Sequence, residues 1–351
     1  MRNKLKTLFK TVDAVLLTSA HNLRYFTGFR GGEGIALITE NACCLFVDSR
    51  YTVAAQAEAP EFDVIEYGGG RRNAEIGQRL KKLAVKRLGF EDHFLTVQEY
   101  QAFQAAWDEI VWQGCSKELE QMRMVKDEAE LGYLRRAEQI GVEAYLAVLP
   151  LLKPGVTENE IAAELDYQMR KRGASGTSFE TIVVSGVKSS MPHGKPDEKK
   201  IEMGDFVTMD FGCRLGGYCS DMTRTVVVGK ASEEQRRIYE TVQRAQQTGL
   251  DTIRAGILGK EADAAAREVI EKAGYGRYFG HSLGHGVGLL IHELPNLSPM
   301  SEILLEPGMI VTCEPGIYIP GLGGVRIEDM VCVTEGGIEN LTRLSKELTE
   351  L

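Results

Sequence analysis

The sequence lacks an excess of basic residues, a long apolar run and cysteines in zinc-binding pairs. Its 41 basic and 50 acidic residues give a net charge of −9, which disfavours nucleic acid as the main partner. No apolar run approaches membrane-spanning length, and the basic start MRNKLKTLFK has no apolar segment typical of an export signal, so we expect no membrane association. The seven cysteines show no paired zinc-ligand spacing and are expected to be reduced thiols in a cytoplasmic protein.

The pattern of the chain changes near residue 116, and 351 residues are enough for two domains. Before that point strand-like runs alternate with helical patterns, which predicts a small α/β domain over residues 1–116. The strand-like runs are DAVLLTS, GIALIT, CCLFVD, DVIEY and RLGFE, and the helical patterns cover 50–59, 73–86 and 97–109. The remainder, residues 117–351, is predicted to form a second domain.

Helical patterns recur through this second domain. One long amphipathic helix is predicted over 117–149, where Lys153-Pro154-Gly155 follows. Thr157 is predicted to begin the next helix, because Glu160 three residues later completes a capping box. Further helices are predicted over 233–254 and from 260 onward. The domain thus divides into two halves, each with helices and a strand hairpin, although the sequence repeat is too weak to prove duplication.

Five side chains able to bind metal lie in the last 150 residues. They are Asp210 in VTMDFG, Asp221 in CSDMTRT, His285 in GHGVG, Glu314 in VTCEPG and Glu328 in VRIED. The charges of the four carboxylates would balance two divalent cations. A single short motif of this kind has roughly a 1 in 10 chance of supplying a ligand. Five of them in one chain, with an arginine and further histidines nearby, favour a two-metal site.

The two aspartates flank a Gly216-Gly217 pair with β-type residues on both sides, which predicts a two-residue hairpin turn. In that register residue 210 faces residue 223 and residue 212 faces Asp221. Because side chains alternate along a strand, Asp210 and Asp221 are predicted to project from one face as diagonal neighbours. Diagonal positions lie about 7–8 Å apart, which suits carboxylates gripping metals about 3.5–4 Å apart.

The other candidates are also placed by strand patterns. Glu314 is predicted to end the strand MIVTCE, which Pro315-Gly316 stops. Glu328 lies in the strand-like GVRIEDMVCV, where Arg326 is predicted to share its face. His285 lies among glycines, where the backbone can pass close to a cluster.

These motifs together resemble a known family. The stretches RMVKDEAEL, LKPGVTENEIAAEL, MPHGKP, GDFVTMDFGCRLGGYCSDMTRT, HSLGHGVGLLIHELP and EPGMIVTCEPGIYIPGLGGVRIED resemble the pita-bread metallopeptidases, in particular the aminopeptidase P and prolidase (Xaa-Pro peptidase) branch. The N-terminal third is similar to the creatinase/prolidase-type accessory domain through NLRYFTGFRGGEGIALIT and LFVDSRYTVAAQAEAP. The resemblance implies an α+β fold: a curved antiparallel sheet covered by helices, preceded by a smaller α/β domain.

The resemblance also implies roles for single residues. His193 and His292 are expected around the substrate, Arg326 is expected to place positive charge near the reacting carbonyl, and His281 is expected at most to support the cluster. It further implies a homodimer and a substrate with proline in second position.

The mechanism expected from these roles is metal-assisted hydrolysis. Asp221 and Glu328 would bridge two metals, while Glu314 would move a proton from the attacking water to the leaving prolyl nitrogen. Oxygen-rich ligation with one imidazole favours Mn²⁺, and Co²⁺ and Zn²⁺ also fit.

Alternative functions remain open at this point. A methionine aminopeptidase shares the catalytic fold but usually lacks the N-terminal domain and the MPHGKP and IHELP patterns. A non-catalytic pita-bread binding protein would have lost ligand residues, and none is missing here. No motif distinguishes an Xaa-Pro dipeptidase from an Xaa-Pro aminopeptidase, because loops or a partner subunit would limit substrate length.

Overall fold

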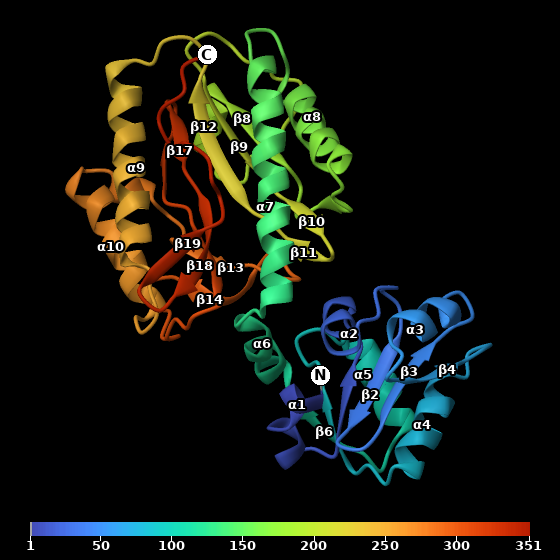
Figure 1. Ribbon diagram of the computed structural model, residues 1–351. Coiled ribbons are helices and arrows are strands. Elements are labelled where there is room, and N and C mark those ends of the chain that lie inside the picture. The colour runs from blue at the N-terminus through green and yellow to red at the C-terminus, as the bar shows by residue number, and fades with distance from the viewer. Residues whose placement is uncertain (1) are drawn as a thin grey trace. The chain divides into compact units, whose positions relative to one another are not determined.

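The computed structural model describes residues 2–351 and divides into two units, one ending at Met122 and one beginning at Arg123 (Figure 1). The first unit is built on one mixed sheet of strand order β4-β3-β2-β1-β5-β6, as expected for an α/β domain. Its strands are β1 (Ala14–Leu17), β2 (Ile35–Thr39), β3 (Cys43–Val47), β4 (Asp63–Glu66), β5 (Arg87–Phe90) and β6 (Val111–Gly114). Its helices are α1 (Arg2–Leu5), α2 (Ala20–Thr27), α3 (Thr52–Glu58), α4 (Arg72–Lys82) and α5 (Val97–Ala106), with the 3₁₀ turn η1 (Leu8–Lys10).

The five predicted strands and three predicted helices of this unit are present, but helices α1 and α2, the turn η1 and strand β6 were not predicted. Helix α2 is only eight residues long, so its periodicity is weak. Its two ends nevertheless carry residue types typical of helix caps. Ser19 accepts a hydrogen bond from Asn22 N at the start, and Gly28 adopts a left-handed φ of 83° at the end.

The second unit combines helix pairs with antiparallel strands, which confirms the architecture expected from the resemblance. In Figure 1 the strands lie between the α7–α8 pair and the α9–α10 pair. The helices are α6 (Ser116–Met124, spanning the division), α7 (Glu128–Val148), α8 (Glu158–Lys171), α9 (Glu233–Thr252) and α10 (Gly259–Lys272), with 3₁₀ turns η2 (Leu149–Leu151), η3 (Gly186–Ser190) and η4 (Gly276–Tyr278). None of the helices between residues 2 and 351 has both the length and the apolar character needed to cross a bilayer.

Every pair of named strands described in this unit is antiparallel. The strands are β7 (Gly176–Thr177), β8 (Ile182–Ser185), β9 (Phe206–Phe211), β10 (Cys213–Leu215), β11 (Tyr218–Cys219), β12 (Met222–Val227), β13 (Gly284–Gly286), β14 (Glu293–Leu297), β15 (Ile310–Cys313), β16 (Gly316–Ile319), β17 (Gly323–Arg326), β18 (Asp329–Thr334) and β19 (Gly337–Asn340). They form the groups β12-β9-β8, β11-β10-β7, β14-β13-β15-β18-β19 and β16-β17.

The prediction of one continuous helix over 117–149 was wrong, because the chain leaves the helix between α6 and α7. Val125 forms an antiparallel bridge with Met309, and Lys126 N donates to Gly308 O at 2.9 Å. Asp127 then restarts the helix through a capping box with Glu130. Pairing with a distant strand therefore overrides the helical periodicity. The capping box predicted at Thr157 and Glu160 is confirmed.

The two halves of this unit repeat one backbone arrangement. Before α8, Gly155 N donates to Ile201 O, and Ile201 N donates back to the next residue. Before α10, Gly256 N donates to Leu305 O, and Leu305 N again donates back to the residue after the glycine. Both glycines have positive φ, +94° and +85°. The halves that sequence similarity was too weak to establish are thus matched in hydrogen bonding.

This repeat places two of the candidate ligands in matching positions. Strand β9 begins at Phe206 and pairs with β12, while β15 begins at Ile310 and pairs in the same way with β18. Asp210 lies four residues into the first strand and Glu314 lies four residues beyond the start of the second. The repeated backbone arrangement therefore places one carboxylate from each half, Asp210 and Glu314, at equivalent positions.

Candidate active site

The β-hairpin that carries two aspartates has the predicted register. Asp210 in β9 pairs with Thr223 in β12. The pairing is interrupted and then resumes nearer the turn, where Arg214 in β10 pairs with Cys219 in β11 in the same register. The gap lies at Gly212, where any Cβ would collide with the carbonyl of Ser220. Gly216 and Gly217 adopt φ values of 58° and 87°, as the tight hairpin turn requires. The hairpin therefore presents Asp210 and Asp221 on one face without a bulge.

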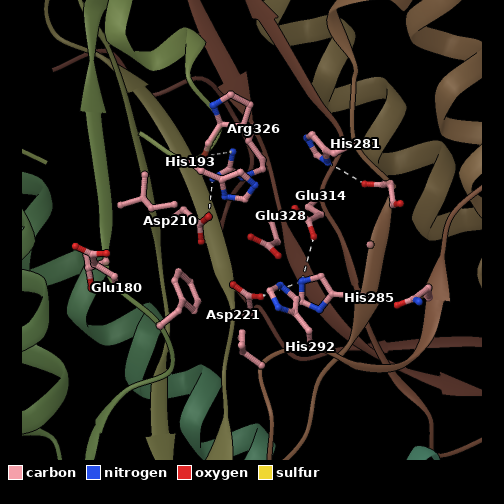
Figure 2. Close-up of a pocket in the computed structure, with 18 of the residues that line it drawn as sticks. Glu180, His193, Asp210, Asp221, His281, His285, His292, Glu314, Arg326 and Glu328 are labelled. Carbon is pink, nitrogen blue, oxygen red and sulfur yellow. Dashed lines mark hydrogen bonds and ion pairs between the residues drawn. The ribbon is translucent and has the colours of Figure 1, made fainter. Parts of the chain in front are cut away.

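The five predicted ligands and the other four candidates line a single cavity of about 570 Å³. Figure 2 shows their side chains converging from both halves of the unit. The candidates that line it are Asp210, Asp221, His285, Glu314, Glu328, His193, His281, His292 and Arg326. Their roles stay predictions, but their assembly in one place is what a shared reaction requires.

His285 and Glu314 are held together by the strand β15. Thr312 accepts a hydrogen bond from His285 N and donates through Oγ1 to Glu314 Oε1, both at 3.1 Å. Gly284 permits this approach, since a Cβ there would collide with the Thr312 carbonyl. His285 Nδ1 lies 3.1 Å from its neighbour's carbonyl at Gly286, which places the proton on Nδ1. Nε2 is then free to act as a ligand.

The Nε2 atom of His285 faces two of the carboxylates. It lies 3.3 Å from Glu314 Oε1 and 3.5 Å from Asp221 Oδ2. One ligand atom each of Asp221, His285 and Glu328 lie within 4.8 Å of one another. These three residues lie in or directly beside β-strands far apart in sequence, so only the fold brings them together.

Glu328 lies between two strands instead of within one, which corrects the predicted continuous strand. Strand β17 ends at Arg326 and β18 begins at Asp329 in another sheet. Thr223 supplies the hydrogen bonds that a neighbouring strand would otherwise give Glu328. The Thr223 carbonyl accepts from Glu328 N at 3.1 Å, and Thr223 Oγ1 donates to Glu328 Oε2 at 2.6 Å. Arg326 Nε donates to the same Oγ1, so Arg326 and Glu328 do face one side as predicted.

Arg326 connects Asp210 to a chain of hydrogen bonds. Its Nη2 donates to Asp210 Oδ2 at 2.6 Å and its Nη1 donates to Tyr318 Oη at 2.8 Å. Tyr318 Oη lies 2.9 Å from His281 Nε2, whose Nδ1 lies 2.9 Å from Ser282 O. Since the carbonyl only accepts, His281 carries its proton on Nδ1 and accepts from the tyrosine. His281 thus supports the cluster at a distance through Tyr318. The N–H groups of Arg326 donate to oxygen atoms of the protein itself.

No motif in the sequence pointed to three residues that bind the site: Tyr318, Thr223 and Thr312. Strand alternation could have identified Tyr318, because the β16–β17 hairpin pairs it with Gly324 and pairs Gly316 with Arg326. Tyr318 and Arg326 are therefore same-face diagonal neighbours. The threonine roles depend on contacts across sheets and had no local signal.

The carboxylates crowd one another in a largely buried cavity, where little water separates their charges. Burial raises the pKa of Asp210, Asp221 and Glu328, and neighbouring carboxylates raise it further. At Asp210 the charge of Arg326 offsets part of this rise. Burial also opposes ionisation of Glu314, but in the metal-free protein a His285 protonated on both nitrogens donates to Glu314 and lowers its pKa to about 2; a cation at Nε2 would replace that proton and its positive charge.

These features fit divalent metal ions. Asp210 Oδ1 is buried without a hydrogen-bond partner among the described residues, while its other oxygen is held by Arg326. Such an orphan acceptor needs a cation or a water. Four clustered carboxylates with one imidazole are a donor set for Mn²⁺-, Co²⁺- or Zn²⁺-type ions.

His193 and His292 lie around the opening of this cavity with exposed side chains. The His292 ring packs against His285 in a T-shaped arrangement, with centroids 4.4 Å apart. Figure 2 shows both rings on the side of the cavity that carries Asp221. His193 precedes Gly194 in the MPHGKP loop and lies near Arg326, whose Nη1 donates to Pro192 O at 3.4 Å.

Comparison with known proteins matches both units. Residues 132–335 match the model of metallopeptidase family M24, and residues 2–125 match the creatinase/prolidase N-terminal domain. The Xaa-Pro dipeptidase of Pyrococcus furiosus is 37% identical over 99% of this chain and 100% of its own. A solved Xaa-Pro dipeptidase of Bacillus anthracis is 44% identical with a TM-score of 0.97, covering 100% of this chain and 99% of that one. The X-Pro aminopeptidase of Thermotoga maritima is 40% identical with a TM-score of 0.92, covering 97% and 98%. The resemblance seen in the motifs is thereby confirmed, and the chain belongs to metallopeptidase family M24.

Proposed function

We propose that this protein is an Xaa-Pro exopeptidase that hydrolyses the bond before proline in dipeptides. The observation that carries the proposal is the assembly of four carboxylates, four further polar candidates and His285 around one cavity of about 570 Å³. The names of the relatives support the proline specificity, since both dipeptidases and an aminopeptidase acting on X-Pro bonds align over nearly the full chain.

Five residues would hold two divalent cations, and two of them, Asp221 and Glu328, would contribute to binding both. The full set is Asp210, Asp221, His285, Glu314 and Glu328. Mn²⁺ is the proposed native ion, because oxygen ligands outnumber nitrogen four to one. When bound, the cations would lower the pKa of the attacking water and polarise the scissile carbonyl.

Glu314 is the proposed proton carrier. Its Oε1 is fixed by Thr312 Oγ1 at 3.1 Å and lies 3.3 Å from His285 Nε2. Positive charge beside it, from His285 in the metal-free protein and from the cations when they are bound, would keep the Glu314 carboxylate ionised near neutral pH, so that it can accept a proton from the attacking water. The same carboxyl would then deliver the proton to the leaving prolyl nitrogen.

His292 and His193 are proposed to contact the substrate. An imidazole at the cavity wall can donate to the oxyanion that develops on the scissile carbonyl, and it can pack against the pyrrolidine ring. Arg326 is proposed to act mainly by orienting Asp210 and by supplying positive potential, because its donors already bind protein oxygens.

Hydrolysis of three peptides tests the proposal. Ala-Pro should be cleaved after reconstitution with Mn²⁺, Ala-Pro-Ala should be cleaved more slowly, and Met-Ala-Ala should be a poor substrate. Faster cleavage of Ala-Pro-Ala would assign an aminopeptidase instead, while preference for Met-Ala-Ala would overturn the proline specificity. No cleavage of any peptide by the metal-loaded protein would favour a binding protein.

Replacing His193 by alanine is expected to lower kcat/KM for Ala-Pro by about 10-fold, the loss of one hydrogen bond or packing contact, and to leave both metals bound. The reason is that His193 lines the cavity but is outside the proposed ligand set. Steady-state kinetics with elemental analysis of the purified variant measure both effects. An ordinary surface histidine would change stability by less than about 0.5 kcal/mol and leave the kinetics alone, so unchanged kinetics would remove His193 from the site.

We further propose a homodimer, as the resemblance implies, in a reducing compartment such as the cytoplasm. The compartment is supported by the seven cysteines, an odd number without paired spacing. Light scattering on the purified protein measures the assembly, and a monomeric mass would contradict the dimer.

A further inference from the structure

Two motifs of the sequence contain charged residues that the proposed ligand set leaves unexplained. Arg123 and Lys126 belong to RMVKDEAEL, and Glu293 belongs to IHELP, 170 residues away. In the fold they form one buried cluster. Arg123 Nε donates to Glu293 Oε1 at 3.3 Å, and Lys126 Nζ lies 3.6 Å from Glu293 Oε2. Their side chains are only 3%, 1% and 4% exposed.

Burial at this depth makes the pairing necessary. A single carboxylate buried without a positively charged partner would carry an uncompensated charge, and removing such a charge from water is unfavourable. One of the two basic residues is anchored by its backbone. Arg123 lies in α6, and Lys126 N is bonded to Gly308 O, in the turn that leads into β15 and Glu314. The cluster thus links Glu293 to the backbone that leads into β15.

Glu293 in turn organises the loop before it. Its Oε1 accepts from Leu290 N at 3.0 Å, and Gly288 N donates to Leu290 O at 3.0 Å. Gly288 leaves the space that the carboxylate fills, because a Cβ there would collide with it. The Gly288 carbonyl accepts from Cys219 N at 2.8 Å, two residues before Asp221. The segment 288–293 is therefore closed around the Glu293 carboxylate.

His292 is the neighbour of Glu293 on this closed segment, and its side chain is exposed toward the cavity. An exposed side chain on a loose loop would sample several positions, whereas the T-shaped contact with His285 requires one, with centroids 4.4 Å apart. We propose that Arg123 and Lys126, acting through Glu293, are positioning residues that hold the His292 imidazole at the active site. The kinetic part of this inference rests on the proposed function.

A double-mutant cycle between Glu293 and His292 tests the proposal. Glu293→Gln keeps the shape but removes the charge that Arg123 and Lys126 bind. It is expected to lower kcat by up to about 100-fold, the cost of displacing a reacting group by about 1 Å, with metal content unchanged. In the His292→Ala background the same change should have less than a 2-fold effect, because the residue it positions is gone. If the two substitutions lower kcat independently, so that the loss in the double variant is the product of the two single losses, the proposal is overturned.

Substitutions of Arg123 test whether its positive charge positions His292 through Glu293, because a lysine at that position should restore what a methionine removes. Arg123→Met is expected to reproduce the loss of Glu293→Gln, while Arg123→Lys, which keeps the positive charge, should retain most of the activity. Arg136→Met is the matched control, because Arg136 pairs with Glu143 on the surface of α7 with 48% of its side chain exposed. The control should behave as the parent protein, and equal losses in Arg123→Lys and Arg123→Met would contradict positioning by charge.

Histidine NMR gives a reading that needs neither metal nor substrate. The His292 resonance, assigned by its absence in His292→Ala, should shift in Glu293→Gln and stay in place in Arg136→Met. An unshifted resonance would overturn the proposal even if the enzyme cleaves Ala-Pro. Conversely, a shifted resonance in a protein that cleaves no Xaa-Pro peptide would leave the positioning standing and refute the proposed function alone.

Discussion

Glu314→Gln is expected to lower kcat by about 10²–10⁴-fold, the usual contribution of general acid–base catalysis. The amide oxygen can still bind a cation and accept from Thr312 Oγ1, which reaches Glu314 Oε1 at 3.1 Å in the parent protein. It cannot take the proton of the attacking water. Metal retention should therefore weaken only in part, while turnover collapses. Steady-state kcat on Ala-Pro, with metal content determined on the same sample, is the measurement.

The control for this variant is Glu302→Gln, since Glu302 is 71% exposed and pairs with Lys260 at the surface. Its kcat should equal that of the parent protein. A near-parental kcat in metal-loaded Glu314→Gln would assign proton transfer to another group, and loss of both metals would reduce Glu314 to a ligand.

Exhaustive chelation is expected to abolish activity, and two equivalents of a divalent cation per chain should restore it. Four carboxylates meet in the cavity, and burial together with their mutual repulsion raises the pKa of Asp221 and Glu328. Two dications would neutralise this cluster. The measurement is a titration of the chelated protein with Mn²⁺, Co²⁺ or Zn²⁺, followed by activity on Ala-Pro.

The same titration should raise the thermal unfolding midpoint, because a ligand that binds only the native state stabilises it. The rise should saturate at the stoichiometry that restores turnover. Full turnover in protein shown by elemental analysis to be free of metal would refute the metal requirement. Saturation at one equivalent would refute the two-metal assignment while leaving metal dependence intact.

Much of the candidate site was open to prediction because its signals are local. Asp210 and Asp221 are tied by a hairpin whose register follows from Gly216-Gly217, and the observed pairing of residue 210 with residue 223 confirms it. The capping box at Thr157 is likewise a contact over three residues. Such features depend on backbone conformations that a few neighbouring side chains decide.

The errors have the opposite origin. The break between α6 and α7 depends on a bridge from Val125 to Met309, and no helix pattern reports a partner so distant in sequence. The strand predicted through Glu328 is interrupted because Thr223 supplies its hydrogen bonds from another sheet. In both places a long-range backbone contact outweighs the local periodicity.

The sequence by itself determined the composition class, the two-part organisation, the ligand-capable residues and the family they indicate, because each rests on residue types or short spacings. Only the tertiary structure decided that all nine candidates line one cavity, that His281 reaches Asp210 through Tyr318 and Arg326, and that Arg123 meets Glu293. These contacts join segments separated by as many as 170 residues. Their geometry follows from how the sheets and helices pack, because buried charges are stable only where the fold supplies a partner.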